Sequence, residues 1–250
     1  MNPAPIAVAV VGAAGRLGQF ACRVFEGDPR WRLVARYERG ERWPDELRAS
    51  GAQIAFEATR AGLGFEHGRQ ILAAGVRPLI ATSGVSVDEV GELDRLARER
   101  QLGGLVVPNF SVGAWLLLRA AELAAAHFEQ VELLEAHHPR KADAPSGTAL
   151  ECARRIARAR AESGAAPFGA QPSAAARGDV RDGIAIHALR LPGVYARQEA
   201  HFASAGELFV LRHEMNGPEA FGPGIVLAAL HCARCSGVGL GLDGVFAARA

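Results

Sequence analysis

Lysine is almost missing from this chain. Of its 28 basic residues, 27 are arginine, and Lys141 is the single lysine among 250 residues. A lysine ammonium is a compact, strongly hydrated charge, whereas the arginine guanidinium is a planar fork of donors. The one position at which the chain uses lysine is therefore the first candidate for a functional side chain.

Cysteine is also scarce, with four residues, and no positive charge precedes the apolar N-terminal run. Few cysteines fit a reducing compartment, and the uncharged start makes a poor signal peptide, so we expect a cytoplasmic protein. Cys232 and Cys235 have the spacing of a redox pair or of half a metal site. The helical periodicity of GIVLAALHCARC favours instead two small buried residues on one face of a helix.

Neither charge nor hydrophobicity is concentrated enough to indicate a nucleic-acid or membrane partner. The 28 basic and 27 acidic residues are mixed along the chain and leave a net charge of +1. A long basic run with interleaved aromatic residues is missing, which argues against nucleic acid. The most apolar helical stretch, 113–128, contains Arg119 and Glu122 and is too short to cross a bilayer. The composition is that of a soluble globular protein.

Apolar β-like runs alternate with helical patterns in the first half of the chain. The β-like runs are 6–11, 32–37, 53–58, 77–82 and 104–109, and the helical patterns are 15–26, 65–74 and 87–100. This alternation predicts an α/β fold with a Rossmann-type, doubly wound parallel sheet and helices on both of its faces.

The pattern changes after about residue 110. Helices are expected at 113–127 and 148–162 and strands at 129–138, 183–191, 194–202 and 207–215, with a surface loop over 163–178. Consecutive strands joined by short turns predict an α+β domain with an antiparallel or mixed sheet. A helix near 218–234 and a glycine-rich tail close the chain.

The first chemical motif is VAVVGAAGRLGQF, which places Gly12, Gly15 and Gly18 after a strand and at the start of a helix. In a dinucleotide fold the first glycine allows a tight turn and the next lets the backbone approach a pyrophosphate. The third allows close packing of helix on strand, and the helix N-terminus favours the negative charge. We therefore expect a dinucleotide site here.

The cofactor type depends on the end of the second strand. Glu38 lies about 20 residues after the glycines, where a carboxylate hydrogen-bonds the adenosine ribose of NAD. Arg39 and Arg16 are candidates to meet the 2′-phosphate of NADP instead. We therefore expect mixed use of the two cofactors, so the expected cofactor is NAD(P)H.

The second motif is EAHHPRKADAPSGTAL, residues 135–150. In a nicotinamide enzyme the cofactor supplies hydride, so the protein must supply a proton and bind the charge of the substrate. Histidine is the natural proton donor near neutral pH, and Lys141 adds a positive charge. The Pro-Ser-Gly-Thr turn leads into a helix whose N-terminus suits a carboxylate. Thr148 and Glu151 have capping-box spacing.

Metal binding is the competing interpretation of the paired histidines. Adjacent side chains of an extended segment point to opposite faces, so His137 and His138 are poor candidates for chelating one ion. We expect no metal site.

These motifs resemble one known family. GAAGRLG (12–18), ATRAG (58–62), PNFSVG (108–113) and above all EAHHPRKADAPSGTA (135–149) are similar to segments of 4-hydroxy-tetrahydrodipicolinate reductase, also called dihydrodipicolinate reductase, of the diaminopimelate route to lysine. The resemblance implies NAD(P)H-dependent reduction of a cyclic dicarboxylate. It also implies a homotetramer assembled through the sheets of the second domains.

The resemblance further implies domain bounds and residue roles. The dinucleotide-binding domain would span 1–112 and be completed by 219–250, and the substrate-binding and oligomerisation domain would span 113–218. His137 would be the proton donor and Lys141 would assist it, while His138, Ser146, Gly147 and Thr148 would bind substrate carboxylates. The cofactor residues would be Gly12, Ala13, Ala14, Gly15, Arg16, Leu17, Glu38, Arg39, Arg60, Ala81, Thr82, Ser83, Val107, Pro108, Asn109 and Phe110.

The chain departs from the family pattern at three places. Ala81-Thr82-Ser83-Gly84 replaces a Gly-Thr-Thr-Gly loop, and Arg197-Gln198-Glu199 replaces a Gly-x-His segment. An arginine that the family uses on a substrate carboxylate is missing near 216–218, with Arg181 and Arg190 as candidate replacements. Two alternative functions therefore stay open. The chain could be a related reductase of another imine or dicarboxylate, or a cofactor-binding homologue without turnover.

Overall fold

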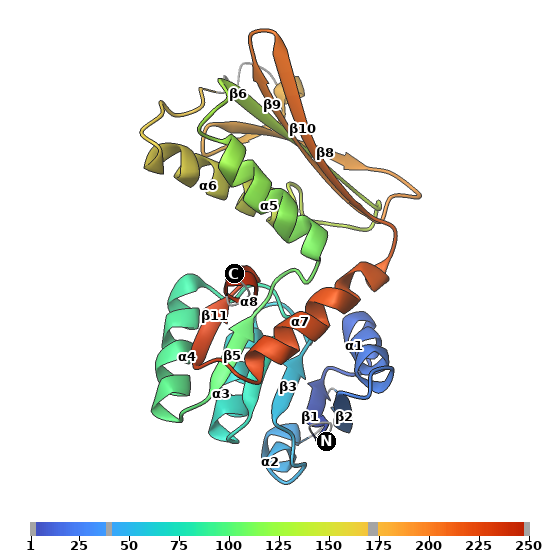
Figure 1. Ribbon diagram of the computed structural model, residues 1–250. Helices are drawn as coiled ribbons and strands as arrows, with labels where there is room; N and C mark the ends of the chain where they lie inside the picture. Colours follow the sequence, from blue (N-terminus) through green and yellow to red (C-terminus); the bar gives the residue numbers. More distant parts are fainter. Residues whose placement is uncertain (1–3, 39–41, 170–174, 248–250) are drawn as a thin grey trace. The chain divides into compact units, whose positions relative to one another are not determined.

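The chain forms two compact units in a computed structural model that describes residues 4–38, 42–169 and 175–247 (Figure 1). Unit 1 contains Met1–Ser111 together with Pro218–Ala250, and unit 2 is the continuous stretch Val112–Gly217. The second unit is thus inserted into the first in sequence.

Unit 1 is built on a six-stranded parallel sheet, so the predicted doubly wound sheet is confirmed. The strands lie in the order β11-β5-β4-β3-β1-β2. They are β1 (Ile6–Val11), β2 (Trp31–Tyr37), β3 (Ile54–Glu57), β4 (Arg77–Ile80), β5 (Gly103–Val106) and β11 (Gly237–Leu240). The inner strands are buried almost throughout, because helices cover both faces of such a sheet.

The helices of unit 1 divide between the two faces of the sheet. They are α1 (Arg16–Glu26), α2 (Trp43–Leu47), α3 (Gly64–Ala73), α4 (Val87–Glu99), α7 (Gly222–Cys232) and α8 (Asp243–Ala247), with a 3₁₀ turn at Pro218–Phe221. Helices α3 and α4 pack against each other, and α1 packs against α7 (Figure 1). Ser86 begins α4 with the reciprocal Ser86–Glu89 capping box, which satisfies two backbone donors of the helix start.

The C-terminal segment supplies an edge strand where the sequence indicated only a glycine-rich tail. Strand β11 pairs in parallel with β5, with Gly237 opposite Gly103 and Leu240 opposite Val106. A Cβ on Gly103 would lie 2.0 Å from the carbonyl oxygen of Cys235, so the close approach requires glycine. A four-residue strand with two glycines has no local signal, and only its pairing with β5 makes it a strand.

The prediction that Cys232 and Cys235 lie on one face of a helix is wrong for Cys235. Helix α7 ends at Cys232, and Cys235 lies in the turn that follows it. Both thiols are free, and burial raises the pKa of each above its usual value. The described part of the chain contains no group of three or more His, Cys, Asp or Glu side chains placed to hold a metal ion.

Unit 2 is an α+β unit with a mixed five-stranded sheet, as predicted. Its strands lie in the order β10-β9-β6-β8-β7, and only the β6–β8 pair is parallel. They are β6 (Gln130–His137), β7 (Asp179–Arg181), β8 (Ile184–Arg190), β9 (Ala196–Ser204) and β10 (Glu207–Met215). Helices α5 (Val112–Ala124) and α6 (Gly147–Glu162) pack together over one face and enclose a core that includes Leu133, Ile156 and Phe202. None of the helices in the described ranges is both long and apolar enough to span a bilayer.

Gly18 offers a test of how tightly α1 packs on the loop after β1. A Cβ at this position would lie 2.1 Å from the carbonyl oxygen of Gly12, a backbone atom that cannot move away easily. We expect Gly18→Ala to lower the free energy of unfolding by about 1–3 kcal/mol, measured by urea denaturation. Gly91→Ala is the matched control: Gly91 lies inside α4 with open space around it, so this change should raise stability by about 0.5–1 kcal/mol. Equal midpoints for the two variants would contradict the packing argument.

Candidate active site

The loop between β1 and α1 has the geometry of a phosphate cradle. Gly12 has φ +87°, and a Cβ there would lie 2.6 Å from the carbonyl oxygen of Ala58. Its N–H and that of Ala13 both donate to the carbonyl of Tyr37, which holds the loop against the end of β2. Gly15 is the N-cap of α1 and has an extended conformation. Because glycine has no side chain, it cannot accept a hydrogen bond from the first-turn N–H groups of α1. The loop therefore presents a helix N-terminus without side-chain obstruction.

The remaining expected cofactor residues come to the same edge of the sheet. In a parallel sheet all strands end at one edge, and loops after β2, β3, β4 and β5 carry Glu38, Arg60, residues 81–83 and residues 107–110. Glu38, Arg60, Ser83 and Pro108 are exposed, whereas Ala81, Thr82, Val107 and Phe110 are buried and shape the loops from beneath. Arg39 lies outside the described residues.

A buried carboxylate that sequence reasoning missed supports this edge. Glu57, the last residue of β3, is fully buried, and its Oε1 accepts the N–H of Thr59 at 3.1 Å and contacts His67 Nδ1 at 3.0 Å. The Thr59 N–H also lies 3.1 Å from the hydroxyl of Thr82, which connects the loops after β3 and β4. Burial alone would raise the pKa of Glu57, but hydrogen bonds from His67 and the two threonines offset it and the net shift is downward. Its sequence signal was an acid inside an apolar strand, QIAFEA.

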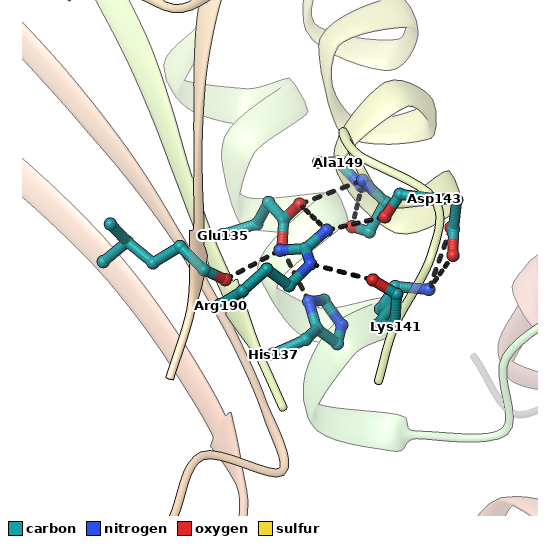
Figure 2. A network of polar contacts seen from close by, with 8 residues as sticks. Glu135, His137, Lys141, Asp143, Ala149 and Arg190 are labelled. Carbon is teal, nitrogen blue, oxygen red and sulfur yellow. Dashed lines mark hydrogen bonds and ion pairs between the residues drawn. The ribbon is translucent and has the colours of Figure 1, made fainter. Parts of the chain in front are cut away.

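The signature stretch of unit 2 is organised around a second buried carboxylate. Glu135, on β6, is fully buried, and Figure 2 shows its two oxygens surrounded by donors. Oε2 lies 2.6 Å from His137 Nδ1 and 2.9 Å from Arg190 Nη1. Oε1 accepts from Arg190 Nη2 at 2.9 Å and from the Ser146 N–H at 3.1 Å. Burial would raise the pKa of Glu135, but the hydrogen bonds from His137 and Arg190 outweigh it, and the pKa falls below its usual value.

Arg190 connects this carboxylate to the loop that carries Lys141. It lies opposite His137 in the parallel β6–β8 register. Besides its two bonds to Glu135, it donates to the carbonyls of Lys141 (3.3 Å), Asp143 (2.6 Å) and Leu189 (2.7 Å). A guanidinium has five N–H donors, and all five are therefore used on protein acceptors.

These contacts bear on the replacement for the missing arginine near 216–218. Arg190 is already committed to protein acceptors, and Arg181 is exposed and paired with Asp179 at 2.8 Å. A substrate carboxylate would therefore have to displace one of these protein acceptors from Arg190 or Asp179 from Arg181, and the compensating role of either arginine stays a prediction.

The helix start after the loop differs from the predicted capping box. Ser146 is the N-cap of α6, and its hydroxyl accepts the Ala149 N–H at 3.2 Å. The box expected from Thr148 and Glu151 is wrong, because Glu151 pairs instead with Arg154 and Arg155 on the next turn. Ser146 itself is buried, whereas Gly147 and Thr148, in the first turn of the helix, are exposed and half-buried respectively.

Lys141 lies close to this helix start in sequence and is partly buried. Its Nζ contacts both oxygens of Asp143, at 2.8 and 2.9 Å, and this hydrogen bond holds the pKa of the Asp143 carboxyl below its usual range. The structure thus brings His137, Lys141, Ser146, Gly147 and Thr148 onto one strand end, loop and helix start. His138 follows the last residue of β6 directly.

Comparison with known proteins decides the family. Residues 6–110 match the model for the N-terminal part of dihydrodipicolinate reductase, and residues 113–243 match the model for its C-terminal part. The chain belongs to the dihydrodipicolinate reductase family.

Known members of the dihydrodipicolinate reductase family match this chain over nearly their whole length. The 4-hydroxy-tetrahydrodipicolinate reductase of Legionella pneumophila (strain Paris) is 38% identical over 240 residues, which cover 94% of this chain and 97% of the relative. That of Streptomyces griseus is 40% identical over 243 residues, with 94% and 96% covered. The dipicolinate-bound dihydrodipicolinate reductase of Paenisporosarcina sp. TG-14 superposes with a TM-score of 0.83 at 30% identity, over 95% of this chain and 98% of that one.

The buried carboxylate of unit 1 makes acid stability testable. Because the pKa of Glu57 is lowered in the folded state, its contribution to stability is present above pH 4.5 and is lost as the pH falls through the lowered value. Glu57→Gln should lower the free energy of unfolding at neutral pH by about 1–3 kcal/mol and flatten its decline below pH 4.5. Glu66→Gln, an exposed acid on α3, should leave both unchanged. Urea denaturation at a series of pH values measures this, and parallel curves for the Glu57→Gln variant and wild type would contradict it.

Proposed function

We propose that this chain catalyses the NAD(P)H-dependent reduction of 4-hydroxy-tetrahydrodipicolinate to tetrahydrodipicolinate, in the diaminopimelate route to lysine. The observation that carries the proposal is the match to reductases of this name at 38–40% identity over 94% of the chain. The folded His137–Thr148 segment supports it, because a histidine, a lysine and a helix N-terminus meet in the one stretch that most resembles the family.

The residues of unit 1 fit a nicotinamide dinucleotide. The positive φ of Gly12 and the uncapped start of α1 leave backbone N–H groups for the pyrophosphate. Gly12, Ala13, Ala14, Gly15, Arg16 and Leu17 would hold the phosphates, Glu38 and Arg39 the adenosine ribose, and Arg60, Ala81, Thr82, Ser83, Val107, Pro108, Asn109 and Phe110 the rest of the cofactor. When bound, the reduced nicotinamide supplies a hydride to the substrate ring.

Unit 2 would bind a small cyclic dicarboxylate. The named ligand of the Paenisporosarcina relative is dipicolinate, which supports this class of ligand. A carboxylate at the start of α6 would receive the N–H groups of Gly147 and Thr148 and the charge of Lys141. Ser146 and His138 complete the proposed set. Preorganised donors of this kind align the substrate before any bond is made.

His137 is the proposed proton donor. Loss of water from the 4-hydroxy substrate leaves a conjugated ring imine, and hydride addition to a ring carbon leaves an enamine. His137 would protonate that enamine, which completes the reduction, and it would regain its proton from solvent. Lys141, on the loop anchored by Arg190, would hold the substrate close to this histidine.

A second function follows from one observation. The chain has no arginine at Asn216, Gly217 or Pro218, and Arg190 is occupied by protein acceptors. The same scaffold would then reduce a related imine or dicarboxylate with fewer or weaker carboxylate contacts. A panel of cyclic imines and oxo acids separates this function from the first.

The proposed setting is the cytoplasm, in which the four cysteines, all free in the structure, remain reduced. The proposed assembly is a homotetramer formed through the mixed sheets of unit 2. Leu208 and Val210 on β10 support it, since they are 65% and 41% exposed on the face opposite Leu211, which packs against the core of unit 2. Exposed apolar side chains grouped on an edge strand are typical of a buried interface.

The reaction is tested with substrate generated in situ by the preceding synthase from pyruvate and aspartate semialdehyde, while NADH or NADPH oxidation is followed. Wild type should turn over, His137→Gln should lose about 10²–10⁴-fold in kcat, and Lys141→Ala should lower kcat and raise KM. His127→Gln, a histidine after α5, is the control. A His137→Gln variant with undiminished kcat would exclude the proton-donor role, and inert wild type that still binds cofactor would exclude the substrate.

The assembly has its own test. Light scattering should give a mass near four times 26.4 kDa for wild type. Leu208→Glu combined with Val210→Glu should dissociate it, because burying two new carboxylates costs several kcal/mol per subunit. A monomeric wild type would refute the tetramer.

A further inference from the structure

We propose that Glu135 and Arg190 are positioning residues that fix which nitrogen of His137 delivers the proton and hold Lys141 beside it. This inference rests on the proposed function, in which His137 is the donor. It concerns two side chains that do not themselves touch the substrate in the proposal: a buried carboxylate and the guanidinium bound to it.

The contacts around Glu135 determine its charge. Its oxygens meet two guanidinium N–H groups and the Ser146 backbone N–H, and each of these groups can only donate. Both contacts of Oε1 are donors, so a carboxyl hydrogen has no acceptor there, and the bidentate guanidinium favours the ionised form. Glu135 is therefore an ionised carboxylate: burial alone would raise its pKa, but hydrogen bonds from His137 and Arg190 lower it.

An ionised Glu135 determines the tautomer of His137. Oε2 lies 2.6 Å from Nδ1, and a carboxylate can only accept, so the hydrogen of this bond belongs to Nδ1. Neutral His137 consequently carries its proton on Nδ1 and leaves Nε2 with the lone pair. In the protonated ring Nε2–H is the acid, because Nδ1–H is held by Glu135. The proton moves from Nε2 to the enamine carbon, and solvent then reprotonates Nε2.

The same carboxylate orients the donor. Glu135 holds the imidazole of His137 in one orientation through the 2.6 Å contact between Oε2 and Nδ1. Its role resembles that of a buried acid that orients a catalytic histidine without itself exchanging a proton.

Arg190 gives this arrangement its rigidity. The bidentate pair with Glu135 fixes the plane of the carboxylate, and the remaining donors hold the carbonyls of Lys141 and Asp143 (Figure 2). The Arg190 guanidinium therefore fixes both the position of the carboxylate that orients His137 and the position of the loop that carries Lys141. A lysine at this position has three donors on a single nitrogen and cannot reproduce the planar fork.

Stability alone is a weak explanation for the pair. Two apolar residues of similar volume are often as stabilising as a buried ion pair. The contacts with His137 and with the Lys141 loop give the pair a role that apolar residues could not fill.

The chain offers a matched control on the same strand. Glu132 on β6 also contacts a histidine and an arginine: His187 Nε2 at 2.7 Å and the Arg177 guanidinium. Three positions from Glu135 along the strand, its side chain points to the opposite face of the sheet. Glu132→Gln removes the same kind of carboxylate without touching the signature stretch.

Kinetics give the first readout. Glu135→Gln should lower kcat by about 10²-fold. Arg190→Lys should lower kcat and raise KM together, since it disturbs both the Glu135 carboxylate and the Lys141 loop. Glu132→Gln should leave kcat and KM as in wild type, with cofactor affinity equal in all variants.

Nitrogen NMR of histidine-labelled protein gives a readout that needs no turnover. The His137 signals are assigned by their loss in His137→Gln. Wild type at high pH should show the hydrogen on Nδ1, and Glu135→Gln should show a mixture of tautomers. The double variant Glu135→Gln/Arg190→Met, which leaves no unpaired buried charge, should behave like Glu135→Gln if the single variant does not fold.

The outcomes separate this inference from the proposed function. Unchanged kcat and tautomer in a folded Glu135→Gln or double variant would overturn the positioning role. Wild type that shows the Nδ1 tautomer but reduces no cyclic imine would refute the proposed function while supporting the tautomer assignment. An Arg190→Lys variant with raised KM alone, and kcat as in wild type, would place Arg190 on the substrate and overturn its positioning role.

Discussion

An ionised carboxylate in a protein interior costs several kcal/mol of lost hydration unless donors replace the water. Glu135 meets this requirement with donors from three separate segments: Arg190 on β8, the Ser146 backbone at the start of α6, and His137 on its own strand. Each donor is needed by the carboxylate, and each is held in place by it. The conformation of the whole signature loop follows from this mutual requirement.

Each unit holds one buried carboxylate beside a histidine, although only Oε1 of Glu57 meets hydrogen-bond partners among the described residues. Glu57 in unit 1 and Glu135 in unit 2 are both fully buried, and both lie at or near the carboxyl end of a strand. Each accepts a backbone N–H and contacts a histidine nitrogen, His67 in one case and His137 in the other. In each unit a buried acid thereby orders the loop that follows a strand, and the loops carry the proposed binding residues.

Periodicity and motif spacing were sufficient for the parallel sheet, the mixed sheet and the phosphate cradle, because those features are encoded within short segments. Features that depend on distant partners were not predictable in this way. Strand β11 exists only through its pairing with β5, and the N-cap of α6 falls on Ser146 instead of Thr148 because Glu135 holds the Ser146 backbone. The pairing of Arg190 with Glu135 was not predicted, since its 53-to-55-residue separation from His137 and Glu135 hides their adjacency in β6 and β8. A sequence without its three-dimensional pairing shows which acids are unusual, but not what they hold.

The pairing of β11 with β5 also has a consequence for synthesis on the ribosome. The central sheet of unit 1 receives its edge strand from residues 237–240, whereas its other five strands are complete by residue 106. Unit 2 lies between them as one uninterrupted stretch and can fold as soon as it has emerged. The nascent chain therefore carries an open sheet edge beside β5 throughout the translation of more than 100 residues, and closes it only when residues 237–240 have emerged.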